Sequence, residues 1–171
     1  MTLKPKNKME LRIAGKVKES IVDGRGIRFV VFTQGCPHRC PDCHNPDTHS
    51  FEGGEVVLVD DLFEEIKDTK MISGVTFSGG EPFCQCEPLI YLAERIRAET
   101  KLNITAFSGY TFEELQSLES SAVQLLRLCD TLIDGRFEKA QKDLTLHYRG
   151  SRNQRVIDVP ASLKEGRAVE V

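Results

Sequence analysis

The sequence predicts an α/β fold built on a mainly parallel sheet. Short runs rich in β-branched and aromatic residues alternate along the chain with stretches in which apolar residues recur at helical spacing. The 171 residues suit one domain, and they contain no internal repeat and no long Pro/Gly/Ser linker that would divide them. We therefore expect a single domain over residues 1–171.

The first half of the chain reads as strand, helix, strand. A strand is expected over residues 26–33 (GIRFVVFT), because a β-branched and aromatic run suits a buried strand. A helix is expected over residues 60–70 (DDLFEEIKDTK), where an acidic start is followed by apolar residues at helical spacing. Residues 74–78 (GVTFS) then form a short strand that stops at two glycines.

The second half repeats this alternation. Apolar residues at helical spacing predict a helix over residues 88–99, and residues 102–107 (LNITAF) read as a strand. A Thr-x-x-Glu capping box opens a helix at residues 111–118, and residues 131–134 (TLID) are again strand-like. A last strand is expected at residues 155–159. Strands and helices in this order predict right-handed βαβ units and parallel strand pairs.

Residues with chemical potential follow these strands. In open α/β sheets, ligands bind outside the carboxyl ends of the strands. The residues found just after a predicted strand are Cys36, Gly79, Gly80, Glu81, Ser108, Gly109, Asp134 and Gly135. We therefore expect the functional site on one rim of the sheet.

The composition argues against a nucleic-acid partner and against a membrane span. The net charge is −3 and the pI is about 5.8. Apolar stretches are much shorter than the roughly 20 residues of a membrane helix. The first ten residues (MTLKPKNKME) lack the apolar segment of a secretory signal. We expect residues 1–10 to be a flexible tail, and the protein to be cytoplasmic.

Three cysteines, Cys36, Cys40 and Cys43, lie within eight positions on a proline-rich loop, GCPHRCPDCHNP. A loop can direct three thiolates at one metal, so this spacing predicts a metal site. One interpretation is a structural zinc site completed by His38 or His44. The other is an iron-sulfur cluster in which three thiolates leave one iron open and therefore reactive.

The loop resembles the cluster motif of the radical S-adenosylmethionine (SAM) superfamily. Residues 22–49 as a whole (VDGRGIRFVVFTQGCPHRCPDCHNPDTH) are similar to the glycyl-radical activating enzymes. Within that family, the resemblance is closest to activators of the anaerobic (class III) ribonucleoside-triphosphate reductase. Three further segments agree: TFSGGEPFCQ at 76–85, TLIDGRF at 131–137 and RGSRNQRVID at 149–158. The resemblance implies an open partial (β/α) barrel of the radical SAM type.

The resemblance also implies a mechanism. Cys36, Cys40 and Cys43 would hold three irons of a [4Fe-4S] cluster, and SAM would chelate the fourth. One electron, from reduced flavodoxin or a similar donor, would cleave SAM to methionine and a 5′-deoxyadenosyl radical. That radical would take a hydrogen atom from a glycine of the anaerobic reductase.

The SAM contacts are carried over in the same way. Backbone groups of the Gly79-Gly80-Glu81 segment would bind the methionyl ammonium, since glycine allows a close approach. Asp42 and His44 would line the nucleoside side. Asp42 departs from the superfamily pattern, which often has an aromatic residue there.

Several assignments stay open. Asn45 and Asp134 could bind SAM, although Asp134 would equally suit a turn. Residues 149–154 could be a solvated loop or could dock the reductase. No chemistry is assigned to Cys84, Cys86 or Cys129. The rival functions are activation of another glycyl-radical enzyme, such as pyruvate formate-lyase, and a non-enzymatic iron-sulfur or zinc module.

Overall fold

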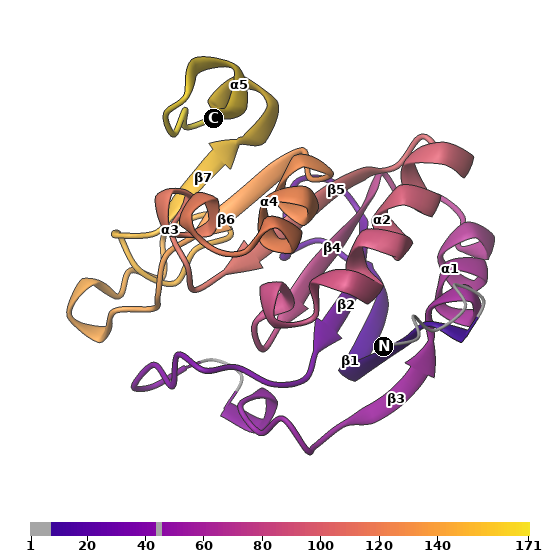
Figure 1. The fold of residues 1–171 in the computed structure, drawn as a ribbon. Coiled ribbons are helices and arrows are strands. Elements are labelled where there is room, and N and C mark those ends of the chain that lie inside the picture. Colours follow the sequence, from indigo (N-terminus) through magenta and orange to yellow (C-terminus); the bar gives the residue numbers. More distant parts are fainter. Residues whose placement is uncertain (1–7, 44–45) are drawn as a thin grey trace.

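The computed structural model describes residues 8–43 and 46–171. Its strands form one seven-stranded sheet in the order β3-β1-β2-β4-β5-β6-β7 (Figure 1). The four neighbouring strands β2, β4, β5 and β6 are parallel. They span Arg28–Thr33, Gly74–Gly79, Asn103–Ser108 and Thr131–Asp134. The sheet does not close, because β3 and β7 form its two edges. The predicted open α/β fold with a parallel centre is confirmed.

Antiparallel strands flank the parallel centre. β1 (Glu10–Ser20) pairs with β2, and β3 (Glu55–Leu58) pairs with the start of β1. The sequence analysis missed both strands. It also placed Glu10 in a flexible tail, whereas Glu10 pairs with Leu58. On the opposite edge, β7 (Arg155–Asp158) runs antiparallel to β6.

The predicted helices are present, with bounds within two residues of those expected. The helices are α1 (Val59–Asp68), α2 (Cys86–Glu99), α3 (Phe112–Ser117), α4 (Ser120–Arg127) and α5 (Val159–Glu165). The capping box at the start of α3 is confirmed. The backbone N–H of Glu114 donates to the Thr111 hydroxyl at 3.1 Å, and that of Thr111 donates to the Glu114 carboxylate at 3.2 Å.

Helices α4 and α5 were not predicted. The sequence analysis extended the last strand to residue 159, but the strand ends at Asp158. The Asp158 side chain accepts a hydrogen bond from the backbone N–H of Ala161, and this cap starts α5. No helix in the described part of the chain is long and apolar enough to span a membrane.

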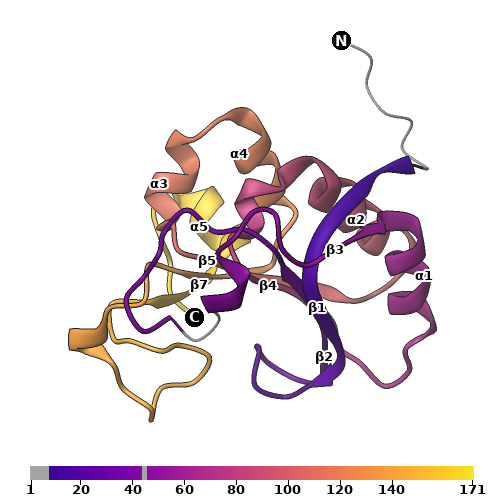
Figure 2. The same ribbon diagram turned by 90° about the horizontal axis from the view of Figure 1, so that it is seen from below.

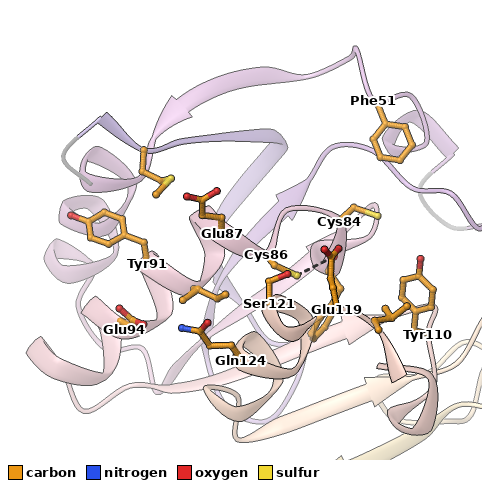
Figure 3. Close-up of a pocket in the computed structure, with 14 residues that line it drawn as sticks. Phe51, Cys84, Cys86, Glu87, Tyr91, Glu94, Tyr110, Glu119, Ser121 and Gln124 are labelled. Atoms are coloured by element: carbon orange, nitrogen blue, oxygen red, sulfur yellow. Dashed lines mark hydrogen bonds between the residues drawn. The ribbon is translucent and has the colours of Figure 1, made fainter. Parts of the chain in front are cut away.

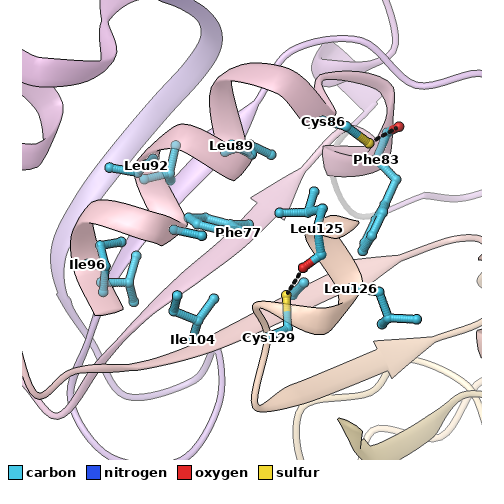
Figure 4. Close-up of a cluster of buried hydrophobic side chains, with 14 of the residues drawn as sticks. Phe77, Phe83, Cys86, Leu89, Leu92, Ile96, Ile104, Leu125, Leu126 and Cys129 are labelled. Atoms are coloured by element: carbon cyan, nitrogen blue, oxygen red, sulfur yellow. Dashed lines mark hydrogen bonds between the residues drawn. The ribbon is translucent and has the colours of Figure 1, made fainter. Parts of the chain in front are cut away.

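The core lies between the sheet and helices α1, α2 and α4, which stand in front of the sheet in Figure 1. Phe77 of β4 and Ile104 of β5 pack there against Leu89, Leu92 and Ile96 of α2, all fully buried (Figure 4). Burying a side chain of this kind contributes roughly 1.5–3 kcal/mol. This packing fixes the strand ends that carry the site.

The site lies where the parallel strands end. Seen from below, the segment after β2 and the segment between β6 and β7 extend from the same end of the sheet (Figure 2). An ion pair joins these two segments, because Lys139 Nζ lies 2.9 Å from the Asp42 carboxylate. The two loops that bound the site are therefore neighbours in space.

Candidate metal centre

A cavity of about 130 Å³ lies at the carboxyl ends of the four parallel strands. Cys36, Cys40 and Cys43 all line it, so the three cysteines share one space. Each of the four strands contributes residues at or just after its end. These residues include Ser78, Gly79, Gly80, Ser108, Gly109, Gly135 and Arg136. The geometry matches the predicted rim.

Backbone hydrogen bonds close the base of the cysteine loop. The N–H of Gly35 donates to the carbonyl of Thr48 at 2.7 Å, and the N–H of Cys36 donates to that of His49 at 3.1 Å. Arg39 within the loop has a φ of 49°, and Asp42 has one of 56°. Residues other than glycine rarely adopt such angles, and here they turn the chain between the cysteines.

The donors in the cavity suit a thiolate-bound metal group. Three sulfur ligands from one short loop are the set used by iron-sulfur clusters and by zinc. Burial raises the pKa of the Cys36 and Cys40 thiols, while contact with the Phe137 backbone acts in the opposite direction on Cys40. Within residues 8–43 and 46–171, no three Cys, His, Asp or Glu side chains already converge as an ion site.

Glu81 is fully buried and holds the cysteine loop from behind the cavity. Its carboxylate lies 2.6 Å from His38 Nε2 and accepts hydrogen bonds from the Ser108 hydroxyl and the Gly109 N–H. The His38 ring also packs edge-on against Tyr110. His38 Nε2, one of the two ring nitrogens that could bind zinc, is therefore engaged with Glu81. The sequence analysis did not foresee this contact.

Gly79 and Gly80 line the cavity, and both are also required by backbone packing. Gly79 has a φ of 94°, and a Cβ there would lie 2.5 Å from the Thr33 nitrogen. A Cβ on Gly80 would lie 2.3 Å from the Gly35 carbonyl oxygen. The sequence analysis explained these glycines by a close approach to a ligand. The structure adds a close approach to β2 and to the cysteine loop.

The predicted nucleoside contacts lie apart from the cavity or outside the described residues. Asp42 is exposed and pairs with Lys139, which lowers the pKa of its carboxyl. His44 and Asn45 lie outside the described residues. The roles assigned to these three residues stay predictions.

The Asp134 carboxylate is buried and already engaged. It accepts hydrogen bonds from the Phe112 N–H at 2.7 Å and from Arg155 Nη2 at 2.6 Å. The first fixes the start of α3, and the second ties β6 to β7. Gly135, which follows, has a φ of 100°, as a turn requires. Of the two readings left open for Asp134, these contacts favour the structural one.

The remaining cysteines lie elsewhere. Cys84 and Cys86 line a separate cavity of about 830 Å³ between α2 and α4, whose wall includes Glu87, Glu94 and Glu119 (Figure 3). Cys129 lies in the core, and its thiol donates to the carbonyl of Leu125 (Figure 4). Burial raises the pKa of Cys86 to about 11 and of Cys129 to about 12, whereas Cys84 is exposed. Neutral thiols of this kind are poor metal ligands and poor nucleophiles.

Comparison with known proteins identifies the family. Residues 22–157 match the family described as the 4Fe-4S single cluster domain, and the match includes the whole cysteine loop. The chain is 36% identical over 143 residues to the anaerobic ribonucleoside-triphosphate reductase-activating protein of Haemophilus influenzae, covering 78% of this chain and 89% of that one. The protein of the same name from Escherichia coli strain K12 is 34% identical over 141 residues, covering 78% and 90%.

This chain belongs to the family of anaerobic ribonucleoside-triphosphate reductase-activating proteins. Membership in this family, and in the 4Fe-4S single cluster family, favours iron and sulfide over zinc on the cysteine loop. Among solved structures, QueE from Escherichia coli is similar, with a TM-score of 0.49 and 17% identity. The similarity covers 62% of this chain and 56% of that one.

Proposed function

We propose that this protein activates an anaerobic ribonucleoside-triphosphate reductase by generating a glycyl radical on it through reductive cleavage of SAM. One observation carries the proposal. The three cysteines with radical SAM spacing line one cavity at the carboxyl ends of the parallel strands. They do so in a chain whose curated relatives bear the name of reductase-activating proteins.

In this proposal Cys36, Cys40 and Cys43 would hold a [4Fe-4S] cluster. When bound there, the cluster would supply the one-electron reduction by which SAM is cleaved and a hydrogen atom is then removed from the target glycine. A zinc site could not do so, because zinc has no redox chemistry. Cys36 is only 9% exposed, so the protein keeps bulk water from this side of the ligand set.

Other residues of the cavity suit the polar end of SAM. Gly79 and Gly80 present backbone with no side chain, which allows the methionyl ammonium to approach their carbonyl groups. Arg136 also lines the cavity, and its guanidinium could donate two parallel hydrogen bonds to one carboxylate. The nucleoside contacts of Asp42 and His44 stay predictions from the family resemblance.

A third cavity, which adjoins the metal cavity, offers a path for the target glycine. It measures about 710 Å³ and shares Ser78, Phe107, Phe137 and Gln154 with the metal cavity. Its outer wall includes Ile21 and Val22, which are 73% and 71% exposed. These two neighbouring apolar side chains would offer a contact to a partner protein at the edge of the cavity. A reductase segment bearing the glycine could enter here and reach the cysteine loop.

The test is electron paramagnetic resonance on anaerobically reconstituted protein, reduced in the presence of SAM. Anaerobic ribonucleoside-triphosphate reductase and pyruvate formate-lyase serve as alternative acceptors. A glycyl radical on the reductase supports the proposal. A radical on pyruvate formate-lyase alone would favour the rival activating function. Zinc instead of iron and sulfide in anaerobically purified protein would exclude the radical mechanism.

Reduced flavodoxin, or a donor of similar potential, remains the proposed source of the electron. Replacing dithionite by reduced flavodoxin in the same assay tests this assignment. No nucleic-acid or membrane partner is proposed, and the cytoplasmic location stays an expectation from the sequence.

A further inference from the structure

The segment between Cys36 and Cys40 reaches the body of the protein through the buried side chain of His38. His38, midway between these cysteines, is 4% exposed and reaches the fully buried Glu81. We infer that His38 and Glu81 form a clamp that positions the cysteine loop, and that the Glu81 side chain is not a direct ligand of SAM. The inference rests on the proposed function for its cofactor and concerns two positioning residues.

The hydrogen bonds of Glu81 leave no acceptor site for a further donor. One carboxylate oxygen faces His38 Nε2 at 2.6 Å and accepts from the Gly109 N–H at 2.8 Å. The other accepts from the Phe83 N–H at 3.1 Å, and the Ser108 hydroxyl bridges the two at 2.9 and 3.0 Å. A carboxylate has about four lone-pair sites. Four donors therefore fill them, and a methionyl ammonium would have to displace one.

The slot around the His38 ring is closely fitted. A Cβ at position 109 would lie 2.3 Å from the ring, so Gly109 is required for the ring to fit. Tyr110 covers the ring edge-on, with centroids 4.5 Å apart. Movement of His38 would therefore disturb the segment after β5 as well as the loop.

The backbone of Glu81 makes a second contact with the cysteine loop. Its N–H donates to the carbonyl of Gly35 at 2.7 Å, directly before Cys36. Glu81 thus contacts the loop on both sides of the first cysteine, through its main chain at Gly35 and its side chain at His38. Since His38 is two residues from Cys36 and two from Cys40, fixing it limits where both sulfur atoms can lie.

The experiment uses anaerobically reconstituted full-length protein and compares His38→Leu, His38→Gln, Glu81→Gln and the His38→Leu, Glu81→Gln double variant. Glutamine can place an N–H near the position of His38 Nε2, whereas leucine cannot donate. Glu99→Gln, which alters a surface ion pair with Arg95, is the matched control. The readouts are the rate at which a ferrous chelator removes iron, the resonance spectrum of the reduced protein, and the dissociation constant for SAM.

Loss of an outer hydrogen-bond partner typically weakens metal binding roughly 10- to 100-fold, and we expect iron removal to accelerate by that order in His38→Leu. Glu81→Gln should accelerate it similarly, and the double variant should be no faster than the faster single variant, because both changes break one clamp. His38→Gln should recover most of the retention, and Glu99→Gln should match the wild type. Among variants that retain iron, SAM affinity should be unchanged.

The opposite pattern would overturn the inference. If Glu81 bound SAM directly, Glu81→Gln would weaken SAM binding while retaining iron, and His38→Leu would keep both its iron and its affinity for SAM. Circular dichroism of the iron-free proteins checks that the sheet is intact, and His38→Gln keeps the comparison valid if a harsher variant misfolds. Iron removal requires neither SAM cleavage nor the reductase, so failure of the proposed function would be recognised separately.

Discussion

Gly80 lies in backbone contact with Gly35, the residue directly before the first cysteine of the loop. A Cβ at position 80 would be 2.3 Å from the carbonyl oxygen of Gly35 and 2.9 Å from that of Thr48. The Gly80 N–H also donates to the Thr33 carbonyl at 2.8 Å. The second glycine of the Gly-Gly-Glu segment is therefore part of the floor on which the cysteine loop rests.

We expect Gly80→Val to lower iron incorporation as well as SAM affinity. Its side chain would push against backbone that cannot move without opening the loop, and such overpacking costs roughly 1–3 kcal/mol. Iron and sulfide analysis after reconstitution, with a SAM binding isotherm, measures both effects. Gly15→Ala is the matched control, because a Cβ at position 15 has no atom within 4 Å. Full iron content in Gly80→Val would contradict this packing role.

Alanine substitution of the three loop cysteines should affect SAM cleavage far more than substitution of Cys129 in the core. Changing Cys36, Cys40 or Cys43 to alanine should abolish SAM cleavage, because each change removes a ligand. Cys129→Ala should retain cleavage and lose about 1 kcal/mol of unfolding free energy, as expected for a small buried truncation. Release of 5′-deoxyadenosine under dithionite is the measurement. Cleavage by Cys40→Ala would show that the assigned ligand set is wrong.

Asp134→Asn should destabilise the protein without weakening SAM binding. The variant keeps the shape of the side chain but loses the charge that faces Arg155 and the start of α3. The Arg155 side chain is 27% exposed and also pairs with Glu113, so we expect a loss of roughly 1–3 kcal/mol rather than the larger cost of an orphaned buried charge. Urea unfolding measures the change in unfolding free energy, and a SAM binding isotherm measures the affinity for SAM. Weaker SAM binding at unchanged stability would restore the SAM-binding interpretation.

The contribution of Glu113 to the stability of the fold should depend on pH, and the sign of this dependence follows from its pKa. The Arg155 guanidinium lowers the pKa of the Glu113 carboxyl below its ordinary value of 4.5. The ion pair therefore stabilises the fold above that ordinary value, and the stabilisation disappears as the pH falls through the lowered pKa. Because Glu113 is 59% exposed, the effect should be about 0.5 kcal/mol.

Urea unfolding of wild type and Glu113→Gln, at neutral pH and at a series of pH values that falls from 4.5 through the lowered pKa, measures this contribution. The two proteins should differ at neutral pH and converge in acid. A gap that widened on acidification would give the wrong sign for the pair.

An Arg149→Ala, Arg152→Ala double variant should uncouple SAM cleavage from radical transfer. Arg149 lines the cavity proposed as the entry path, and Arg152 is exposed beside it in the chain. Neither is proposed to touch the cluster, so cleavage without the reductase should equal that of the wild type. The glycyl radical formed on the reductase should decrease, as measured by electron paramagnetic resonance. Arg127→Ala, at the exposed end of α4, is the control, and equal radical yield in all three proteins would make this segment a plain solvated loop.

Local sequence determined much of the fold. The parallel strands and helices α1 to α3 follow from patterns within ten to fifteen residues, because burial on one or both faces imposes its period on the sequence. Strand β1 was missed for the same reason. Its buried residues are confined to Leu11, Ile13 and Ser20, and the rest of it is partly or fully exposed and mostly polar, including two lysines. Such a strand is specified by pairing with β2 and β3, not by its own pattern.

The candidate site divides in the same way. The sequence alone singled out the three cysteines as a metal site, because their spacing is local to one loop, while the choice of a cluster over zinc came from the family resemblance. Tertiary structure decided what the neighbouring polar residues do. Glu81 meets His38 across 43 positions, and Asp134 meets Arg155 across 21. The role of a carboxylate depends on which hydrogen-bond donors the fold places next to it. Those donors are brought together by the order of the strands, which no local pattern of residues records.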